Sequence, residues 1–274
     1  MSFRPRPPIR DHRSSVAQIG LMFATIAAPT RGSAGDPASE PSGLMVLQVD
    51  AISPAFSSLP VDAADRLRDI PGIRVIAPEI YGMAPAVEGT RPDDLATAPE
   101  KFAVILGRDV VAHSRREGDL LRRSLLPGPG GGRFLAEGDR GKPHVVISRK
   151  LARIFAGGRG REKAPGDTLR VGDEDLRIVG VYETGSQLFD HILVMDTEVA
   201  RRLLGVEEGR VSSFYVEAAD PGRTQRLAEV IEARMPGLSA RIVSNRLPRT
   251  ERPGGDAPMA NPPLRPDGDS RHPD

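Results

Sequence analysis

The sequence predicts an α+β fold: a split βαβ, ferredoxin-like (porter-like) lobe with an inserted, small strand-rich α/β lobe. A strand, a helix, a Pro-Gly stop and a second strand occur in this order twice. One such unit is too small to bury the apolar faces of its own helix and strands, so the two copies are expected to lie side by side in one layer. The chain between the copies then forms the inserted lobe.

The first strand–helix–strand unit begins with LMVLQVDA at residues 44–51, an apolar run typical of a buried strand. Residues 61–70 follow as a predicted helix, because apolar side chains recur there at helical spacing. These side chains are Val61, Ala64, Leu67 and Ile70. Pro71-Gly72 stops the helix, and IRVIAP at residues 73–78 resumes as a strand.

The second unit repeats this order near the other end of the chain. SSFYVEAAD at residues 212–220 is the predicted strand, and SARIVS at residues 239–244 is its partner. Between them lies a predicted helix that ends at Pro236-Gly237. Its inward-facing side chains are Leu227, Val230 and Ile231.

The inserted lobe is expected between these units. HVVISRKLARIF at residues 144–155 indicates a strand that leads into a short helix. APGDTLRVGDEDLRIVGVYETGSQLFDHILVMD, at residues 164–196, predicts an antiparallel hairpin with its turn at GDED. The expected division is residues 43–106 for the first half of the porter-like lobe, 107–195 for the insertion and 196–245 for the second half.

Both ends of the chain are predicted to be disordered, because residues 1–42 and 246–274 are rich in Pro, Gly, Ser and Arg. Residues 16–28, VAQIGLMFATIAA, follow several arginines and have the length of a signal-peptide apolar region, short of the roughly 20 residues that span a bilayer. We therefore expect export or membrane association through this segment, with a candidate cleavage site near Ala34. The alternative is an inert or buried apolar segment.

Charge and cysteine content exclude several function classes. Lys plus Arg number 38 against 37 Asp plus Glu, so no overall field favours nucleic acid as a partner. The chain has no cysteine, which excludes disulfides and thiolate metal sites. HSRREGDLLRR at residues 113–123 is basic, but Glu117 and Asp119 interrupt it and no aromatic residue stands among the arginines. An exposed helix or linker is the favoured interpretation of this run.

No motif in the sequence indicates catalysis, and we predict no catalytic, cofactor-binding or metal-binding residues and no cofactor. The 5 histidines are scattered without metal-ligand spacing. The glycines at 130–132 lack the Lys and Ser/Thr of a phosphate loop, and no Gly-x-Ser-x-Gly motif is present. The alternative is a metal-independent envelope enzyme that uses Asp190 or Glu183 with His191. A surface or turn role is favoured for His191, because neighbouring strand residues point to opposite faces.

The order of several short segments resembles that of a known family. These segments are LMVLQVD, LPVDAADRLRDIPGIRVIAPEIYG, FAVILGRD, GGRFLAEGD, HVVISRKLARIF, PGDTLRVGDEDLRIVGVYETGSQLFDHILVM and ARRLLG. Together they are similar to the extracytoplasmic core domain of MacB/FtsX/LolC-type ABC transporter permeases. The resemblance covers residues 43–245, and it rests on the common order of motifs that are each weak alone.

This resemblance implies a non-catalytic domain outside the cytoplasmic membrane, placed between the first and second membrane helices of a permease. In the family a separate ATPase domain or subunit supplies the energy, and its nucleotide-driven motion is transmitted to the outer domain. The family exports lipoproteins, peptides, antibiotics and toxins, or regulates cell-wall hydrolases. The expected partners are ABC permease or ATPase subunits, a lipoprotein or another envelope protein, and the expected location is periplasmic or at the cell membrane.

A loop and a second segment are the candidate partner contacts; in the loop, an apolar pair stands among turn formers. They are GSQLFD at residues 185–190, with Leu188 and Phe189, and PEIYGM at residues 78–83, with Tyr81 and Met83. The alternative for Phe189 is inward packing over the hairpin. The sequence departs from a complete permease because the apolar segment 16–28 is short and residues 246–274 are polar. A freestanding outer domain is therefore expected, and the alternative is a truncated relic without independent function.

Overall fold

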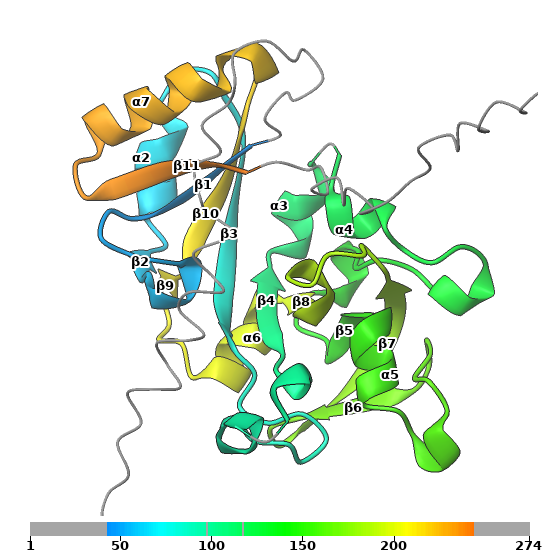
Figure 1. Ribbon diagram of the computed structural model, residues 1–274. Coiled ribbons are helices and arrows are strands. Elements are labelled where there is room, and N and C mark those ends of the chain that lie inside the picture. Colours follow the sequence, from blue (N-terminus) through cyan, green and yellow to red (C-terminus); the bar gives the residue numbers. More distant parts are fainter. Residues whose placement is uncertain (1–42, 97, 117, 244–274) are drawn as a thin grey trace, which may run out of the picture.

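The computed structural model describes residues 43–243 apart from positions 97 and 117 (Figure 1). The predicted disordered tails and the apolar segment 16–28 lie outside the described residues. The described strands are β1 (Gly43–Gln48), β2 (Leu59–Pro60), β3 (Ile73–Met83), β4 (Val104–Arg108), β5 (His144–Ser148), β6 (Thr168–Val171), β7 (Glu174–Tyr182), β8 (Ile192–Asp196), β9 (Arg210–Val211), β10 (Ser213–Ala218) and β11 (Leu238–Val243). The α-helices are α2 (Ala63–Arg68), α3 (Val110–Ser114), α4 (Leu120–Arg123), α5 (Arg149–Ile154), α6 (Thr197–Leu204) and α7 (Thr224–Arg234).

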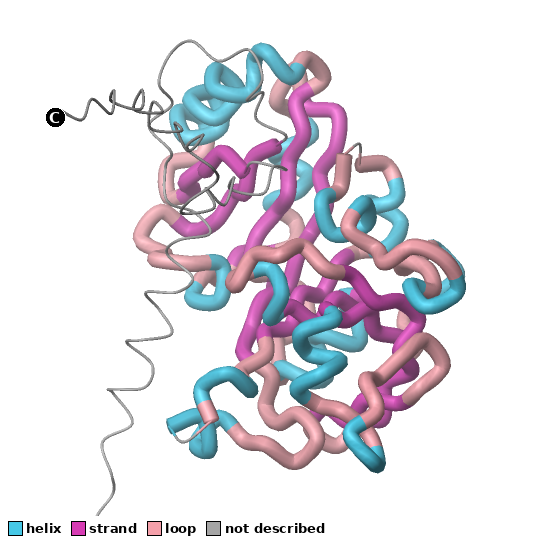
Figure 2. The backbone as a smooth tube through the Cα atoms, turned by 45° about the vertical axis from the view of Figure 1, so that its right-hand side comes forward, coloured by secondary structure: helices cyan, strands magenta, loops and turns pink. Residues whose placement is uncertain are grey.

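One 9-stranded mixed sheet runs through the molecule in the order β11-β1-β10-β3-β4-β8-β5-β7-β6. The strands, magenta in Figure 2, lie along its centre with helices outside them. The predicted α+β class is confirmed. β2 and β9 form a separate two-stranded ladder beside this sheet.

The two predicted strand–helix–strand units interleave as a ferredoxin-like half-sheet. β1 and β3 come from the first unit, β10 and β11 from the second, and β1 pairs antiparallel with both strands of the second unit. β3 then pairs antiparallel with β10. Helices α2 and α7 lie together over one face of these strands (Figure 1), where Leu67, Leu227 and Ile231 share one apolar core.

Both predicted Pro-Gly stops end a helix and turn the chain back toward the sheet. Gly72 and Gly237 have φ values of 93° and 105°, a region that residues with a Cβ rarely adopt. Helix α2 spans 6 residues and is shorter than the predicted range 61–70, and α7 spans 11 residues. The stops therefore place the second strand of each unit.

The remaining strands extend the same sheet beyond β3. β4 pairs with β3 antiparallel and with β8 in parallel, and β5 pairs antiparallel with β8 and in parallel with β7. The predicted hairpin is confirmed as β6 and β7, and the predicted strand and helix at residues 144–155 are β5 and α5. The predicted lobe boundary at 106/107 falls within β4, and the division into lobes stays a prediction.

β3 joins the two parts of the sheet, and it is longer than predicted. It spans 11 residues, whereas the sequence indicated a strand only up to Pro78. Its first part, Ile73 to Glu79, pairs with β10, and its last part, Glu79 to Met83, pairs with β4. Pro78 is accommodated because its carbonyl oxygen accepts from Asp109 N at 3.5 Å on the β4 side, where no N–H from Pro78 is needed.

Helix α6 packs closely against this junction. A Cβ atom at Gly107 of β4 would overlap the Cβ atom of Ala200 in α6. Asp196 begins the helix by accepting from Glu198 N, and Gly205 ends it in the left-handed conformation. Helix and sheet therefore meet with backbone near backbone at Gly107.

Candidate functional site

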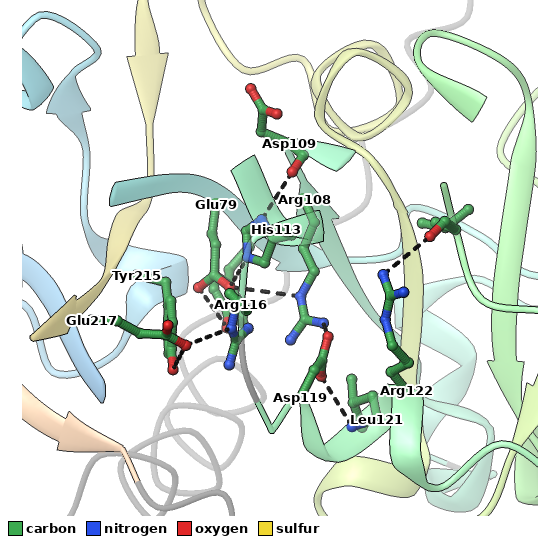
Figure 3. A network of polar contacts seen from close by, with 12 residues as sticks. Glu79, Arg108, Asp109, His113, Arg116, Asp119, Leu121, Arg122, Tyr215 and Glu217 are labelled. Carbon is green, nitrogen blue, oxygen red and sulfur yellow. Dashed lines mark hydrogen bonds and ion pairs between the residues drawn. The ribbon is translucent and has the colours of Figure 1, made fainter. Parts of the chain in front are cut away.

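A chain of buried charged side chains crosses three neighbouring strands at the junction of the two parts of the sheet (Figure 3). Glu217 comes from β10, Glu79 from β3 and Arg108 from β4, with side-chain exposures of 3%, 2% and 8%. The segment that follows α3 lies over them and contributes Arg116 and Asp119. Burying this many charges is costly unless each is paired, so the pairing defines the site.

Glu79 is the centre of this network. Its Oε1 atom lies 3.0 Å from Nε2 of His113 and 3.7 Å from Nε of Arg108. Its Oε2 atom accepts from the Tyr81 hydroxyl at 3.1 Å. Burial raises the pKa of Glu79, but the hydrogen bond to His113 and the charges of Arg108 and Arg116 outweigh burial and lower it overall.

His113 links helix α3 to this carboxylate. Its Nδ1 atom lies 3.1 Å from the Asp109 carbonyl oxygen, so both ring nitrogens face hydrogen-bond acceptors. Only the protonated ring donates to both. Burial lowers the pKa of His113, and the hydrogen bond to Glu79 opposes that shift. The double contact is therefore complete only at a pH below this lowered pKa.

Arg108 and Asp119 form the closest buried ion pair of the network. Arg108 Nη1 donates to Asp119 Oδ2 at 2.8 Å, and Asp119 Oδ1 accepts from Leu121 N at the start of α4. Burial raises the pKa of Asp119, but the charges of Arg108 and Arg116 outweigh it and hold that pKa well below its usual range. The pair thus fixes the start of α4 against β4.

Arg116 connects the same segment to β10. Its guanidinium lies 3.4 Å from the centroid of the Tyr215 ring, and its Nε atom lies 3.7 Å from Glu217 Oε1. Tyr215 donates its hydroxyl to Glu217 Oε1 at 3.0 Å, and Arg74 donates to Glu217 Oε2 at 2.6 Å. Burial, opposed by Arg116 and aided by Glu217, raises the pKa of Tyr215 to about 12.

A small cavity of about 50 Å³ lies beside these groups, the size of one or two water molecules. Arg108 and Arg116 are among its lining residues. Nε of Arg108 and both Nε and Nη1 of Arg116 are buried without a hydrogen-bond partner among the described residues, which is uncommon for buried donors.

The structure brings two of the predicted contact residues to this cavity. Tyr81 and Phe189 both line it. Tyr81 is buried at 8% exposure, because it lies on the inner face of β3 with its hydroxyl on Glu79, so its side chain is not part of the surface. Met83 and Leu188 are half-buried and do not line the cavity. A partner contact at these residues stays a prediction.

The expectation of an exposed helix or linker at residues 113–123 holds for Ser114, Arg115, Arg122 and Arg123, which are exposed, but it is wrong for the residues that form the network. His113, Asp119 and the side chain of Arg116 are buried, because their partners Glu79, Arg108 and Glu217 come from strands distant in the sequence. A helical or loop charge run ordinarily indicates a solvated face, so the basic run alone could not reveal these pairs. The acidic residues that interrupt the run were the only signal, since Asp119 pairs with Arg108.

Asp190 and His191, which the alternative enzyme hypothesis names as an acid–base pair, instead make contacts that stabilise a loop. Asp190 Oδ1 accepts from Thr184 N and Oγ1 at 2.9 and 2.7 Å, and Oδ2 accepts from Gly185 N. His191 ends the short 3-10 helix Phe189–His191 and is buried: it stacks on Phe102 with 3.8 Å between ring centroids, and its Nδ1 bonds to the Phe102 carbonyl oxygen. These contacts hold the loop between β7 and β8.

Within the described part of the chain, no group of three or more His, Cys, Asp or Glu side chains is arranged to hold a metal ion. None of the helices in residues 43–243, positions 97 and 117 aside, is long and apolar enough to cross a bilayer.

Comparisons with known proteins agree with this fold. The periplasmic region of MacB from Actinobacillus actinomycetemcomitans superposes with a TM-score of 0.51 at 14% identity, covering 74% of this chain and 90% of that one. The extracellular domain of the noncanonic ABC-type transporter YknZ from Gram-positive bacteria gives a TM-score of 0.48 at 13% identity, covering 72% and 98%. No curated protein matches the chain significantly.

The architecture is thus similar to that of the periplasmic region of MacB. A family model, the MacB-like periplasmic core domain, matches residues 19–234. The chain belongs to this family.

Proposed function

We propose that this chain is a non-catalytic extracytoplasmic domain of a MacB/FtsX-like ABC transport system and that it acts through protein contacts. The family match to residues 19–234 supports a place in such a system. The proposed roles are export, lipoprotein handling or regulation of the envelope, with a permease or ATPase subunit as partner.

The observation that carries the proposal is the position of the two ends of the described domain. Gly43 and Val243 are paired residues of neighbouring strands β1 and β11, so the chain enters and leaves the sheet at the same place. A domain inserted between two consecutive membrane segments needs its ends close together. Both strands also pack, through Met45 and Val243, against the core that adjoins the charged network.

The charged network supports a mechanical role for the domain. Glu79 on β3 contacts His113 of α3. On the strands beside it, Arg108 contacts Asp119 and Glu217 contacts Arg116, both from the segment that follows α3. Removing one partner of a buried pair is costly, because the other charge is left buried and unpaired. The two parts of the sheet would then move as one body when force is applied at the ends. We also propose that Leu188, Phe189 and Met83 form the partner contact, since the strand register Met83–Val104–Ile192 places them at one end of the sheet.

Cell fractionation of the source bacterium, with N-terminal sequencing of the mature chain, tests the location. The proposal predicts that the chain is found outside the cytoplasm or in the membrane fraction, and that a permease subunit co-purifies after mild chemical cross-linking. A chain confined to the cytoplasm with an intact amino terminus would contradict it. Loss of the cross-linked permease in a Leu188→Asp/Phe189→Asp variant, with a Glu183→Asp control retaining it, would support a contact at these two residues.

A further inference from the structure

The first part of β3 has one edge without a strand neighbour. β10 pairs with Ile73 to Glu79 on one side, whereas β4 pairs only with Glu79 to Met83 on the other. The last rung on the β4 side is the bond from Asp109 N to the Pro78 carbonyl oxygen, after which the chain turns into α3. Within the described residues, Ile73 to Ala77 therefore have no strand on the β4 side.

The direction of the backbone groups follows from this rung. In an antiparallel sheet, the N–H and C=O of alternate residues point to opposite neighbours. The Pro78 carbonyl points toward β4, and the Glu79 carbonyl accepts from Ser212 N on the β10 side. The N–H and C=O of Ile76 consequently point away from β10, into the space where β4 would have continued.

That space is a cleft of about 720 Å³. Residues of β3 from Ile73 to Pro78 form its floor, α2 borders it on one side, and α3 borders it on the other. β3 and α3 are the central cyan strand and the green helix beside it in Figure 1. A strand laid along Ile73–Ala77 would be about five residues long, or about 17 Å at a rise of about 3.3 Å per residue.

The two walls of the cleft differ in character. The α2 wall offers Val61, which is 43% exposed, together with Ala64 and the carboxylate of Asp62. The α3 wall offers the exposed guanidinium groups of Arg115 and Arg140, for which no ion pair is recorded within the described part of the chain.

The other charged groups that line the cleft are engaged. Asp65 pairs with Arg68, and Arg74 pairs with Glu217. Asp109 accepts from Val111 N and Ala112 N at the start of α3. The charges left over are thus cationic on the α3 wall and anionic, through Asp62, on the α2 wall.

We propose that this cleft binds an extended segment of a partner protein, which adds to the sheet as a strand beside Ile73–Ala77. Backbone bonds to Ile76 would supply affinity, as in other cases of strand addition. Successive side chains of an added strand point to opposite faces, so acidic residues would meet Arg115 and Arg140 and apolar residues would meet Val61 and Ala64. The segment is therefore short, extended and alternating apolar and acidic. This proposed binding site depends on the open edge of β3, and it does not depend on whether the domain works with a transporter.

The probe for this site is a labelled seven-residue peptide that alternates Val and Glu, with a copy N-methylated at alternate backbone positions as control. In the free protein, amide exchange measured by NMR should be fast at Ile76 and slow at Ala77, whose N–H faces β10. Addition of the probe to about 1 mM should slow exchange at Ile76, and the N-methylated copy should not. Fast exchange at Ile76 in the presence of saturating probe, or slow exchange without it, overturns the proposal.

Variants distinguish recognition through backbone hydrogen bonds from nonspecific binding of the peptide. Ile76→Pro removes the N–H that faces the cleft and also shortens a side chain that packs against the core under α2 and α7, so Ile76→Ala, which shortens the side chain alone, is its control. Ile76→Pro should weaken probe binding about tenfold, whereas Ile76→Ala should bind as the parent does. Arg115→Glu with Arg140→Glu should also weaken binding, and Arg66→Glu on the part of α2 outside the cleft should not. If Ile76→Pro binds the probe as tightly as the parent does, the proposal is overturned. It is also overturned if the parent chain self-associates and Ile76→Pro abolishes this association, because the cleft would then bind a second copy of the chain. Should Ile76→Pro fail to fold, the exchange rates of the parent decide.

Discussion

Gly43 and Tyr215 are in closer contact than any residue with a side chain at position 43 would permit. A Cβ atom on Gly43 would lie 2.5 Å from the Tyr215 hydroxyl oxygen and 2.6 Å from the ring carbon that bears it. Tyr215 in turn contacts Arg116 and Glu217. The first residue of β1 therefore touches the charged network directly.

Gly43→Ala should destabilise the domain for this reason. The new methyl group must displace the Tyr215 ring, and overpacking of this kind costs typically about 1–3 kcal/mol. Thermal unfolding followed by circular dichroism measures the effect. Gly158→Ala is the matched control, because nothing lies within 4 Å of its added Cβ. Equal melting temperatures for the two variants would show that Tyr215 is not held against β1.

Asp119→Asn should be among the most damaging single substitutions in the network. It keeps the shape and an oxygen for Leu121 N but leaves the buried Arg108 charge without its closest partner, and breaking a buried pair costs about 3–5 kcal/mol. Urea unfolding at pH 7 gives the free energy change. Asp175→Asn, which breaks the exposed pair with Arg170, should change it by less than about 1 kcal/mol. Similar losses in both variants would contradict burial of the Arg108 pair.

Stability should fall as the solution is acidified. The folded-state pKa values of Asp119 and Glu79 are lowered, so these carboxylates contribute stability above their unfolded pKa values and lose it as the pH falls toward the folded ones. Urea midpoints should therefore decline from about pH 5 downward. Asp119→Asn should flatten that decline. A midpoint that rises on acidification, or an unchanged slope in Asp119→Asn, would be inconsistent with these shifts.

Gly107→Ala should loosen α6 from β4, and a second substitution should restore the contact. The added Cβ collides with the Cβ of Ala200, so Gly107→Ala alone should cost about 1–3 kcal/mol. Ala200→Gly removes the colliding atom but weakens the helix by about 1 kcal/mol. A double-mutant cycle should show a favourable coupling between the two substitutions. Strict additivity would mean that helix and strand are farther apart than described.

The repeated strand–helix–strand units were predictable because local signals define them. Gly72 and Gly237 end their helices at the predicted places, and the alternation around Leu169 and Leu176 gave the hairpin. The full length of β3 was not predictable, since Pro78 ordinarily ends a strand. The strand continues because Pro78 lies next to Glu79, where pairing passes from β10 on one edge of β3 to β4 on the other edge. This change of partner depends on the arrangement of the whole sheet.

The charged network was hidden from sequence for a different reason. His113 and Glu79 are 34 residues apart, and Tyr215 and Arg116 are farther still. Charges that are paired across strands look the same in sequence as charges that face water. The candidate contact loop at Leu188 and Phe189 was found from its composition alone, and the structure adds only that Phe189 lines the cavity beside the network.

Labelling of a single introduced cysteine tests the central claim, that this domain works outside the cytoplasm. The chain has no native cysteine, so Asp173→Cys at the exposed tip of the β6–β7 hairpin would carry the only thiol. In intact spheroplasts of the source bacterium, a membrane-impermeant maleimide should label this residue as completely as it does after lysis. Labelling only after lysis would contradict the account.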